Sequence, residues 1–197
     1  MLGHGIGGRM LSQRQGVRGV TLIELMIGIA ILSILMAMAV PSFRAWIQNG
    51  KVRTVAESIQ NGLQIARIEA IQRNTRVQFE LLDEGKGGTW TVCVQPNPAG
   101  SCPDPDDGDD STIQSRSADE GSSTAVTVET ISGDEDRPVV FAPSGRVADN
   151  PVIFEVDTDA LETAESRELR IIVGASGSVR LCDPFFEADD DPRGCSD

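Results

Sequence analysis

The sequence predicts an α+β protein in which one long N-terminal helix packs against an antiparallel β-sheet head. Two observations lead to this fold class. An apolar run from Val20 to Val40 passes into a segment that keeps helical periodicity to about Arg73. Short runs rich in Val, Ile, Thr and Phe then follow, and turn-forming residues bound each of them. A helix with one apolar stripe needs a partner surface, which a sheet of these strands provides.

Residues 1–19 form a short basic leader. They include Arg9, Arg14 and Arg18 and no acidic residue. A basic flank before an apolar run is typical of a membrane-targeted N-terminus whose leader stays on the cytoplasmic side. The run is too long for an ordinary secretory signal, and no small-x-small cleavage site follows it. A plain signal anchor of a single-pass protein remains an alternative.

Residues 20–41 form the apolar half of the expected helix. At about 1.5 Å per residue the run spans roughly 30 Å, the thickness of a bilayer core. It holds one carboxylate, Glu24, near its start. A carboxylate at that end of a membrane helix can reach the interface and interact with the positive end of the helix dipole.

Residues 42–74 form the amphipathic half. Its apolar residues recur at steps of three and four: Val52, Val55, Ala56, Ile59, Leu63, Ala66 and Ala70. Pro41 lacks a backbone donor, so we expect it to bend or locally open the helix between the two halves.

Residues 75–197 form the β-rich head. The expected strands are Arg76–Leu82, Thr89–Val94, Thr124–Thr130, Val139–Phe141, Val152–Val156, Leu169–Val173 and Val179–Cys182. Turns are expected at Pro143–Gly145, at 149–151 and, as a hairpin, at Gly174–Gly177. The segment between Pro96 and Ser123 is rich in Asp, Pro, Gly and Ser, so we expect a surface loop. Its aspartates do not fit an EF-hand frame, because Pro103 and Pro105 occupy ligand positions.

Charge is distributed unevenly between the two halves. Residues 1–74 carry eight Lys/Arg against three acids, about +5, and residues 75–197 carry nine against 27, about −18, which together give −13. An acidic head argues against nucleic acid as a partner, because phosphate contacts need clustered Lys and Arg. The charge indicates a solvent-facing domain.

The head contains four cysteines, Cys93, Cys102, Cys182 and Cys195. Four cysteines allow three connectivities, of which nearness in sequence favours Cys93–Cys102 and Cys182–Cys195. An even number beyond a membrane indicates an oxidising compartment. A zinc site is disfavoured, since the chain has no CxxC pair and its one histidine, His4, lies in the leader. We expect no metal and no cofactor.

Enzymatic motifs are not found in the sequence. It has no Gly-rich phosphate loop and no nucleophile elbow, and beyond the leader it has neither His nor Tyr. Ser144 lies among turn formers with no histidine base. We therefore expect a protein that is not an enzyme.

RGVTLIEL, followed by the apolar run and Pro41, resembles the class III signal of type IV prepilins and pseudopilins. The resemblance implies a type IV pilin-like fold. It also implies that a prepilin peptidase cuts after Gly19 and methylates Val20, which replaces the usual Phe. Glu24 would then pair with the freed amine of a neighbouring subunit, so that two opposite charges offset each other's burial. Pro41 matches the helix-opening proline of the family.

The head resembles the GspH/FimT/FimU group of minor pilins and pseudopilins. FAPSGRV (141–147) and GSVRLC (177–182) carry this resemblance, and CDPFFEADDDPRGC (182–195) is more similar to the FimT/FimU pilus branch. It implies a minor pilin that acts near the pilus tip with other minor and major pilins. Before assembly the chain would wait in the bacterial inner membrane, with its head in the periplasm.

Three alternatives stay open. A minor pseudopilin of type II secretion would share the architecture. A DNA-binding pilin for DNA uptake would use a Gly-Arg-x-Arg motif, of which the chain keeps only Arg180, with Ser178 at the first arginine position. A plain signal-anchored periplasmic domain would leave Gly19 uncleaved and make Glu24 dispensable.

Overall fold

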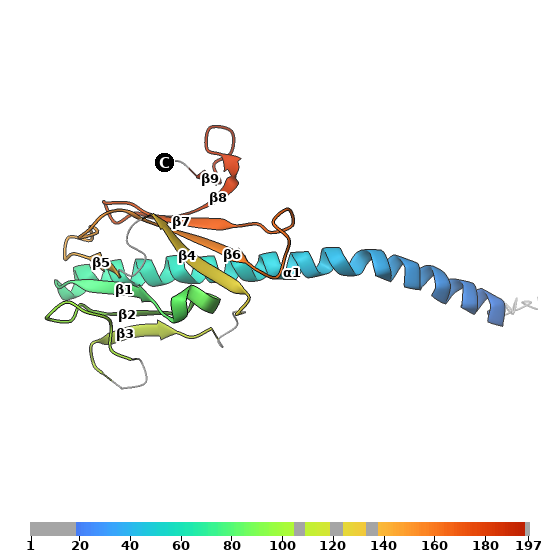
Figure 1. The fold of residues 1–197 in the computed structure, drawn as a ribbon, viewed down its shortest axis with the longest axis horizontal. Coiled ribbons are helices and arrows are strands. Elements are labelled where there is room, and N and C mark those ends of the chain that lie inside the picture. Colours follow the sequence, from blue (N-terminus) through green and yellow to red (C-terminus); the bar gives the residue numbers. More distant parts are fainter. Residues whose placement is uncertain (1–18, 105–108, 119–123, 133–137, 196–197) are drawn as a thin grey trace, which may run out of the picture. The chain divides into compact units, whose positions relative to one another are not determined.

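The computed structural model describes residues 19–104, 109–118, 124–132 and 138–195. Helix α1 (Leu22–Arg73) opens the fold and β-strands follow it (Figure 1). The strands are β1 (Val77–Leu81), β2 (Trp90–Val94), β3 (Thr112–Arg116), β4 (Val126–Ser132), β5 (Val139–Phe141), β6 (Val152–Thr158), β7 (Leu169–Val173), β8 (Val179–Glu187) and β9 (Gly194–Cys195). A short 3₁₀ helix, η1 (Asp83–Gly88), joins β1 to β2. The chain divides after Pro41 into two compact units.

The first unit contains the apolar part of α1. An 18-residue window of this helix has a mean hydropathy of 2.5, and none of that window is buried. Side chains from Leu22 to Val40 are exposed on every side of the helix. A helix that is apolar all round is suited to a lipid environment or to a bundle of similar helices.

The second unit buries the predicted stripe of α1. All the apolar residues expected on that stripe are fully buried, which confirms the prediction: Val52, Val55, Ala56, Ile59, Leu63, Ala66 and Ala70. They share one core with Phe79 of β1 and Trp90 of β2. Gly62 lets these rings approach closely, because a Cβ there would come within 2.8 Å of the Phe79 ring.

The head contains two sheets where a single sheet was expected. Four strands have the order β3-β2-β1-β5, and five have the order β4-β6-β7-β8-β9. The pairs are antiparallel except β8 with β9, which is parallel. The three-residue β5 pairs with β1 and makes one isolated bridge, from Phe141 to Val147, whereas β4 pairs with β6, so the second sheet starts its own ladder. Phe154 and Ile171 of the second sheet join the same core as the helix stripe.

Strand β3 corrects the expectation of a loop from Pro96 to Ser123. Thr112–Arg116 pairs antiparallel with β2, and half-buried Ile113 packs against the core. The strand sits between acidic and Ser-rich neighbours and contains one large apolar residue, so its pattern was hidden. The remaining parts of that segment at 105–108 and 119–123 lie outside the described residues.

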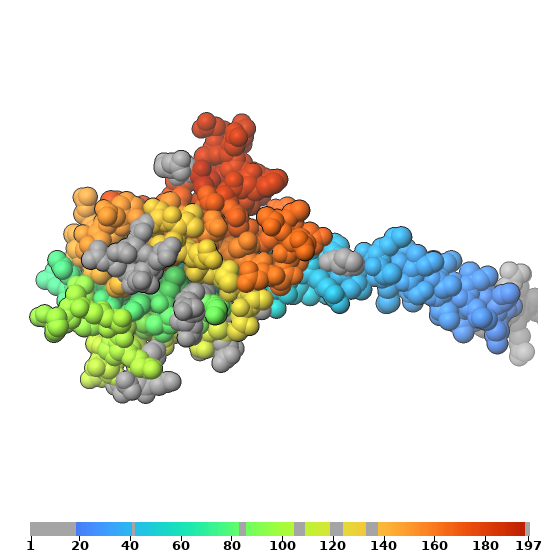
Figure 2. All heavy atoms as spheres, viewed as in Figure 1, coloured from blue at the N-terminus to red at the C-terminus, as the bar shows by residue number. Residues whose placement is uncertain are grey.

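Strand β8 also corrects an expectation, because it continues past Cys182 to Glu187. The chain then turns and returns as β9. The resulting C-terminal lobe (residues 182–195) protrudes from the surface of the second unit (Figure 2, red). The turns predicted at Pro143–Gly145 and Gly174–Gly177 are confirmed by hydrogen bonds from Gly145 N to Ala142 O and from Gly177 N to Gly174 O, both 2.8 Å long.

Candidate functional site

Glu24 lies in the first turn of α1 and caps it together with Thr21. The amide of Glu24 donates to Thr21 Oγ1 at 3.3 Å, and the amide of Thr21 donates to Glu24 Oε2 at 3.5 Å. This reciprocal pair is a capping box, which satisfies two backbone donors that a helix start leaves open. Glu24 therefore has a structural role inside its own chain, with one carboxylate oxygen engaged.

The expected processing site lies directly before this cap. Gly19 and Val20 are exposed and lie outside any helix or strand, and α1 begins only at Leu22. A Cβ added at Gly19 would meet no atom within 4 Å. The peptide bond between the two residues is thus open to an enzyme. Pro41 lies within α1, and the local opening expected there stays a prediction.

The two head motifs singled out in the sequence meet in the fold. The turn after β5 ends at Gly145, with φ of 74°, and the β7–β8 hairpin contains Gly177, with φ of 78°. A Cβ on Gly177 would collide with the carbonyl oxygen of Gly145. Arg67 of α1 donates from Nε to that same carbonyl at 3.1 Å. Both sheets and the helix are therefore joined where Gly145 of FAPSGRV meets Gly177, the first residue of GSVRLC.

A disulfide joins Cys93 of β2 to Cys102, with Cα atoms 5.8 Å apart. The loop that it closes is also held by β1. Gln78 Nε2 donates to Gly100 O at 2.9 Å, and the amide of Cys102 donates to Glu80 Oε2 at 2.7 Å. This bridge belongs to the scaffold of the first sheet.

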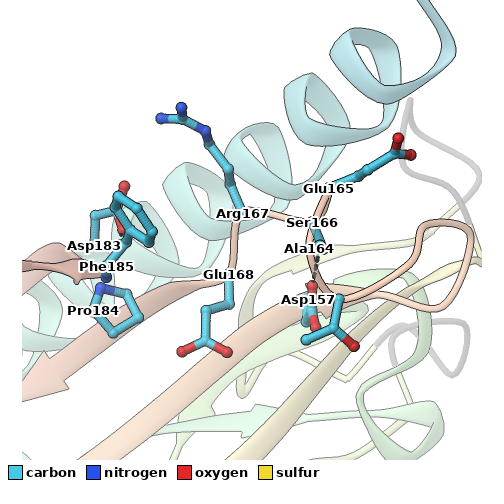
Figure 3. A pocket seen from close by; sticks show the side chains of 10 residues that line it. Asp157, Ala164, Glu165, Ser166, Arg167, Glu168, Asp183, Pro184 and Phe185 are labelled. Atoms are coloured by element: carbon cyan, nitrogen blue, oxygen red, sulfur yellow. Dashed lines mark hydrogen bonds between the residues drawn. The ribbon is translucent and has the colours of Figure 1, made fainter. Parts of the chain in front are cut away.

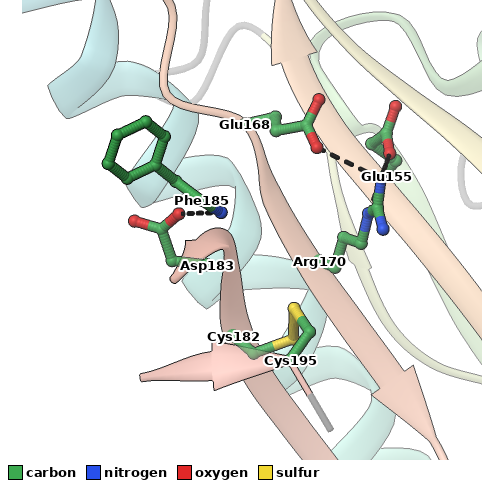
Figure 4. Close-up of polar contacts among 7 residues, drawn as sticks. All are labelled: Glu155, Glu168, Arg170, Cys182, Asp183, Phe185 and Cys195. Atoms are coloured by element: carbon green, nitrogen blue, oxygen red, sulfur yellow. Dashed lines mark hydrogen bonds and ion pairs between the residues drawn. A yellow bond between two sulfur atoms is a disulfide. The ribbon is translucent and has the colours of Figure 1, made fainter. Parts of the chain in front are cut away.

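The second disulfide, Cys182–Cys195, closes the C-terminal lobe, with Cα atoms 5.1 Å apart (Figure 4). Inside the lobe the Arg193 guanidinium lies 4.2 Å from the centre of the Phe186 ring. Arg193 also pairs with Asp191 at 2.7 Å, and hydrogen bonds from Arg193 lower the pKa of Asp191 to about 2. A cation–π contact and an ion pair thus order a lobe that contributes little to the core.

A cavity of about 370 Å³ lies beside this lobe. Its lining comes from three parts of the chain: Asp157 at the end of β6, residues 163–168 of the β6–β7 loop, and Asp183, Pro184 and Phe185 of β8. Figure 3 shows Glu165 and Arg167 pointing away from Asp157 and Glu168. The Ser166 hydroxyl donates to Asp157.

Asn49 of α1 holds the β6–β7 loop, which forms part of this cavity's lining, by two hydrogen bonds. Its Nδ2 donates to the Glu165 carbonyl at 3.0 Å, and its Oδ1 accepts from the Arg167 amide at 3.0 Å. One side chain thus uses both its donor and its acceptor on the loop backbone. The loop position is set by the helix.

The electrostatics of the cavity wall are negative. Arg170 pairs with Glu155 at 2.8 Å and with Glu168 at 3.2 Å (Figure 4). The pKa of Glu168 is raised by partial burial and then by repulsion from Glu155, with smaller contributions from Asp157 and Asp183 that Arg170 opposes. Within the described ranges no three metal-ligating side chains are grouped to hold an ion. The cavity wall can accept hydrogen bonds from a cationic group.

Arg180 lies on β8 opposite Ile172 of β7, and its side chain is exposed. Ser178, which stands at the first arginine position of the DNA-uptake motif, accepts a 3.2 Å hydrogen bond from the Ser176 hydroxyl. The acidic residues nearest to Arg180 in the sequence are Glu168 before it and Asp183 after it.

Comparison with known families identifies the chain. A family model described as type II transport protein GspH matches residues 55–177, and a model of the prokaryotic N-terminal methylation motif matches residues 14–40. The chain belongs to the GspH family. Both matches include part of α1: the methylation motif ends at residue 40, in its apolar half, and the GspH match begins at residue 55, within the buried stripe.

Solved structures of minor pilins and pseudopilins are similar to this GspH-family chain. The type IV minor pilin FimU of Pseudomonas aeruginosa has a TM-score of 0.52 at 16% identity, over 77% of this chain and 99% of that one. The minor pseudopilin EpsH from the type 2 secretion system of Vibrio cholerae has a TM-score of 0.49 at 15% identity, over 68% and 98%. The FimU likeness shows a shared fold. No curated protein matches the chain.

The GspH-family chain is a minor pilin or pseudopilin of a type IV pilus or a type II secretion system. Its methylation motif implies processing by a prepilin peptidase. Its apolar N-terminal helix is consistent with membrane anchoring, and members of the family are structural components that assemble with other pilins.

Several residues that shape these sites were missed in the sequence. The Thr21–Glu24 capping box has a recognisable T-x-x-E pattern, which could have been found. No local sequence pattern indicates the roles of Asn49 and Phe185. The partners of Asn49 lie 116 and 118 residues away, and exposure of Phe185 at 84% depends on how the lobe folds.

Proposed function

We propose that this GspH-family chain is a minor pilin of a type IV pilus that acts near the fibre tip. It waits in the inner membrane with its head in the periplasm, and it enters the fibre with other minor and major pilins. The observation that supports the pilus over the secretion machine is the lobe closed by Cys182–Cys195. The lobe favours the pilus because its sequence resembles the FimT/FimU branch.

Processing and assembly follow from the start of α1. Prepilin peptidase cuts after Gly19 and leaves a methylated amine on Val20. Glu24 Oε2 accepts from the Thr21 amide, while Oε1 has no partner among the described residues. One oxygen of Glu24 can therefore cap its own helix and the other can pair with the amine of a neighbouring subunit. In an apolar fibre core such a pair offsets the cost of burying each charge alone.

When one surface of a subunit binds a different surface of the next subunit, repetition of that contact generates an open helical filament. An exposed apolar helix half and an acidic head of about −18 over residues 75–197 suit a fibre with helices inside and heads outside. The same head charge opposes DNA as a direct ligand, although Arg180 is exposed.

Deletion of the gene separates the two machines. We expect loss of surface pili and of twitching motility, with export of secreted proteins intact and with restoration by the wild-type gene. The measurements are the amount of pilin in the fraction sheared from the cell surface and the exoprotein activity in the medium. Exoproteins trapped in the periplasm of cells that still carry pili would assign the chain to type II secretion.

A further inference from the structure

An exposed aromatic pair follows the apolar span of α1. Phe43 is 59% exposed and Trp46 is 71% exposed, and their rings stack with centroids 5.9 Å apart. The neighbouring Ile47 is 39% exposed. The other tryptophan, Trp90, is 2% exposed and donates from its indole to Ser58 Oγ at 2.9 Å. The Trp46 indole N–H has no hydrogen-bond acceptor among the described residues.

Basic residues accompany the aromatic pair. Arg44 lies between Phe43 and Trp46, and its side chain makes no ion pair or hydrogen bond with any residue that the structure describes. From Ser42 to Ala56 the sequence contains Arg44, Lys51 and Arg53 and no acidic residue. This stretch therefore has a charge opposite to that of the head. Its charge is complementary to anionic phospholipid headgroups.

We propose that Phe43, Arg44, Trp46 and Ile47 form a collar that lies in the lipid headgroup layer on the periplasmic face of the membrane. Tryptophan and other amphipathic rings concentrate in this layer, with the ring body in the apolar part and the N–H toward polar groups. Arginine at the end of a span likewise places its charge among phosphates.

The spacing along the helix fits this layer. If the hydrocarbon ends near Val40, Phe43 and Trp46 follow that end by three and six residues in the sequence, which is about 4.5 and 9 Å of helical rise. The headgroup region is roughly 5–8 Å thick on each side. Side chains on a helix tilt toward its N-terminus, which brings the Trp46 ring back toward the membrane. Both rings thus reach the layer where they are most stable.

The collar rests on the proposed membrane-anchored stage and adds to it. It sets the depth at which the span stops in the bilayer. Entry into a fibre then requires the collar to leave the headgroups, which adds to the free energy of extracting the subunit.

Tryptophan fluorescence of the full processed chain in phosphatidylglycerol–phosphatidylethanolamine vesicles tests the collar. Lipids carrying a quenching nitroxide either near the headgroup or at mid-chain report the depth of an indole. Trp90 is buried, so Trp46 supplies the responsive signal. The matched control has Trp46→Phe with Ile68→Trp, which places a tryptophan at a half-exposed site on the same helix about 33 Å further along.

We expect the headgroup-proximal quencher to reduce Trp46 emission at least about twofold more than the mid-chain quencher does, with a blue shift on vesicle binding. Neither quencher should affect the tryptophan at position 68. Quenching of Trp46 no greater than that of the control, or strongest from mid-chain, overturns the collar while the chain still floats with vesicles. Failure to float with vesicles overturns the membrane-anchored stage itself.

Discussion

Glu24 has two oxygens with different surroundings, and this separates two roles for one residue. Oε2 accepts from the Thr21 amide in the chain's own capping box, which needs an acceptor but no charge. Pairing with a neighbour's amine needs the charge. Glu24→Gln keeps the acceptor and loses the charge, whereas Glu24→Ala loses both.

We expect both Glu24 variants to be cleaved by prepilin peptidase and to be absent from fibres. The reason is that a protonated amine buried in the fibre core without a carboxylate costs several kcal/mol. Immunoblots of membrane and sheared-fibre fractions measure cleavage and incorporation. Normal incorporation of Glu24→Gln together with failure of Glu24→Ala would show that the cap, and not the charge pair, is what assembly needs.

The two sheets approach closely at Gly177 because this residue has no side chain. Its φ of 78° is a left-handed conformation, and a Cβ would meet the Gly145 carbonyl that Arg67 also binds. Gly177→Ala is expected to lower the free energy of unfolding by about 2 kcal/mol or more. Urea unfolding followed by Trp90 fluorescence measures the loss. Gly100→Ala is the matched control, because its Cβ would meet only Pro98 O at 4.0 Å, and it should change stability by less than about 0.5 kcal/mol.

At the level of elements, local pattern decided what the sequence could predict. The stripe from Val52 to Ala70 repeats over several turns, and each member is buried. Strand β3 has five residues and one apolar contact, so its place in the sheet depends on pairing with β2 and not on its own composition. The division into two sheets depends on which strands pair, and that information is not local.

The candidate sites divide in the same way. Short local sequence patterns are enough to locate the Gly19–Val20 bond, Glu24 and the cysteines. Asn49 reaches the β6–β7 loop only after the whole head has folded. Exposure of Trp46 likewise follows from where the head begins to cover α1, and periodicity alone did not show that point.

The C-terminal lobe is an element that its own disulfide closes. None of the described residues from 183 to 195 belongs to the hydrophobic core. Replacing Cys182 and Cys195 by Ser should lower the free energy of unfolding by about 1–3 kcal/mol and speed hydrogen exchange of the Asp183 and Gly194 amides. Strands β6 and β7 should stay protected, as exchange monitored by mass spectrometry can show. Equal loss of protection in β6 and β7 would mean that the lobe is part of the cooperative core.

At the scale of the whole molecule, the two units have different sources of stability. The head contains its own core, in which the second part of α1 packs against both sheets, and every residue of that core lies beyond Pro41. The first unit exposes its apolar side chains on all sides, so it needs lipid or neighbouring helices. Folding of the head and anchoring of the stem are therefore expected to be separable.

Removal of residues 1–41 should leave a head that is soluble without detergent. Its free energy of unfolding should match that of the head in the intact chain within about 0.5 kcal/mol, because no core contact is lost. Removal of residues 1–56 takes away Val52, Val55 and Ala56, all fully buried. At about 1–3 kcal/mol for each larger side chain, that loss approaches the total stability of a small domain, so this variant should be unfolded. Circular dichroism and urea titration of the two truncations measure the difference, and equal stability of both would show that the stripe of α1 contributes little to the head.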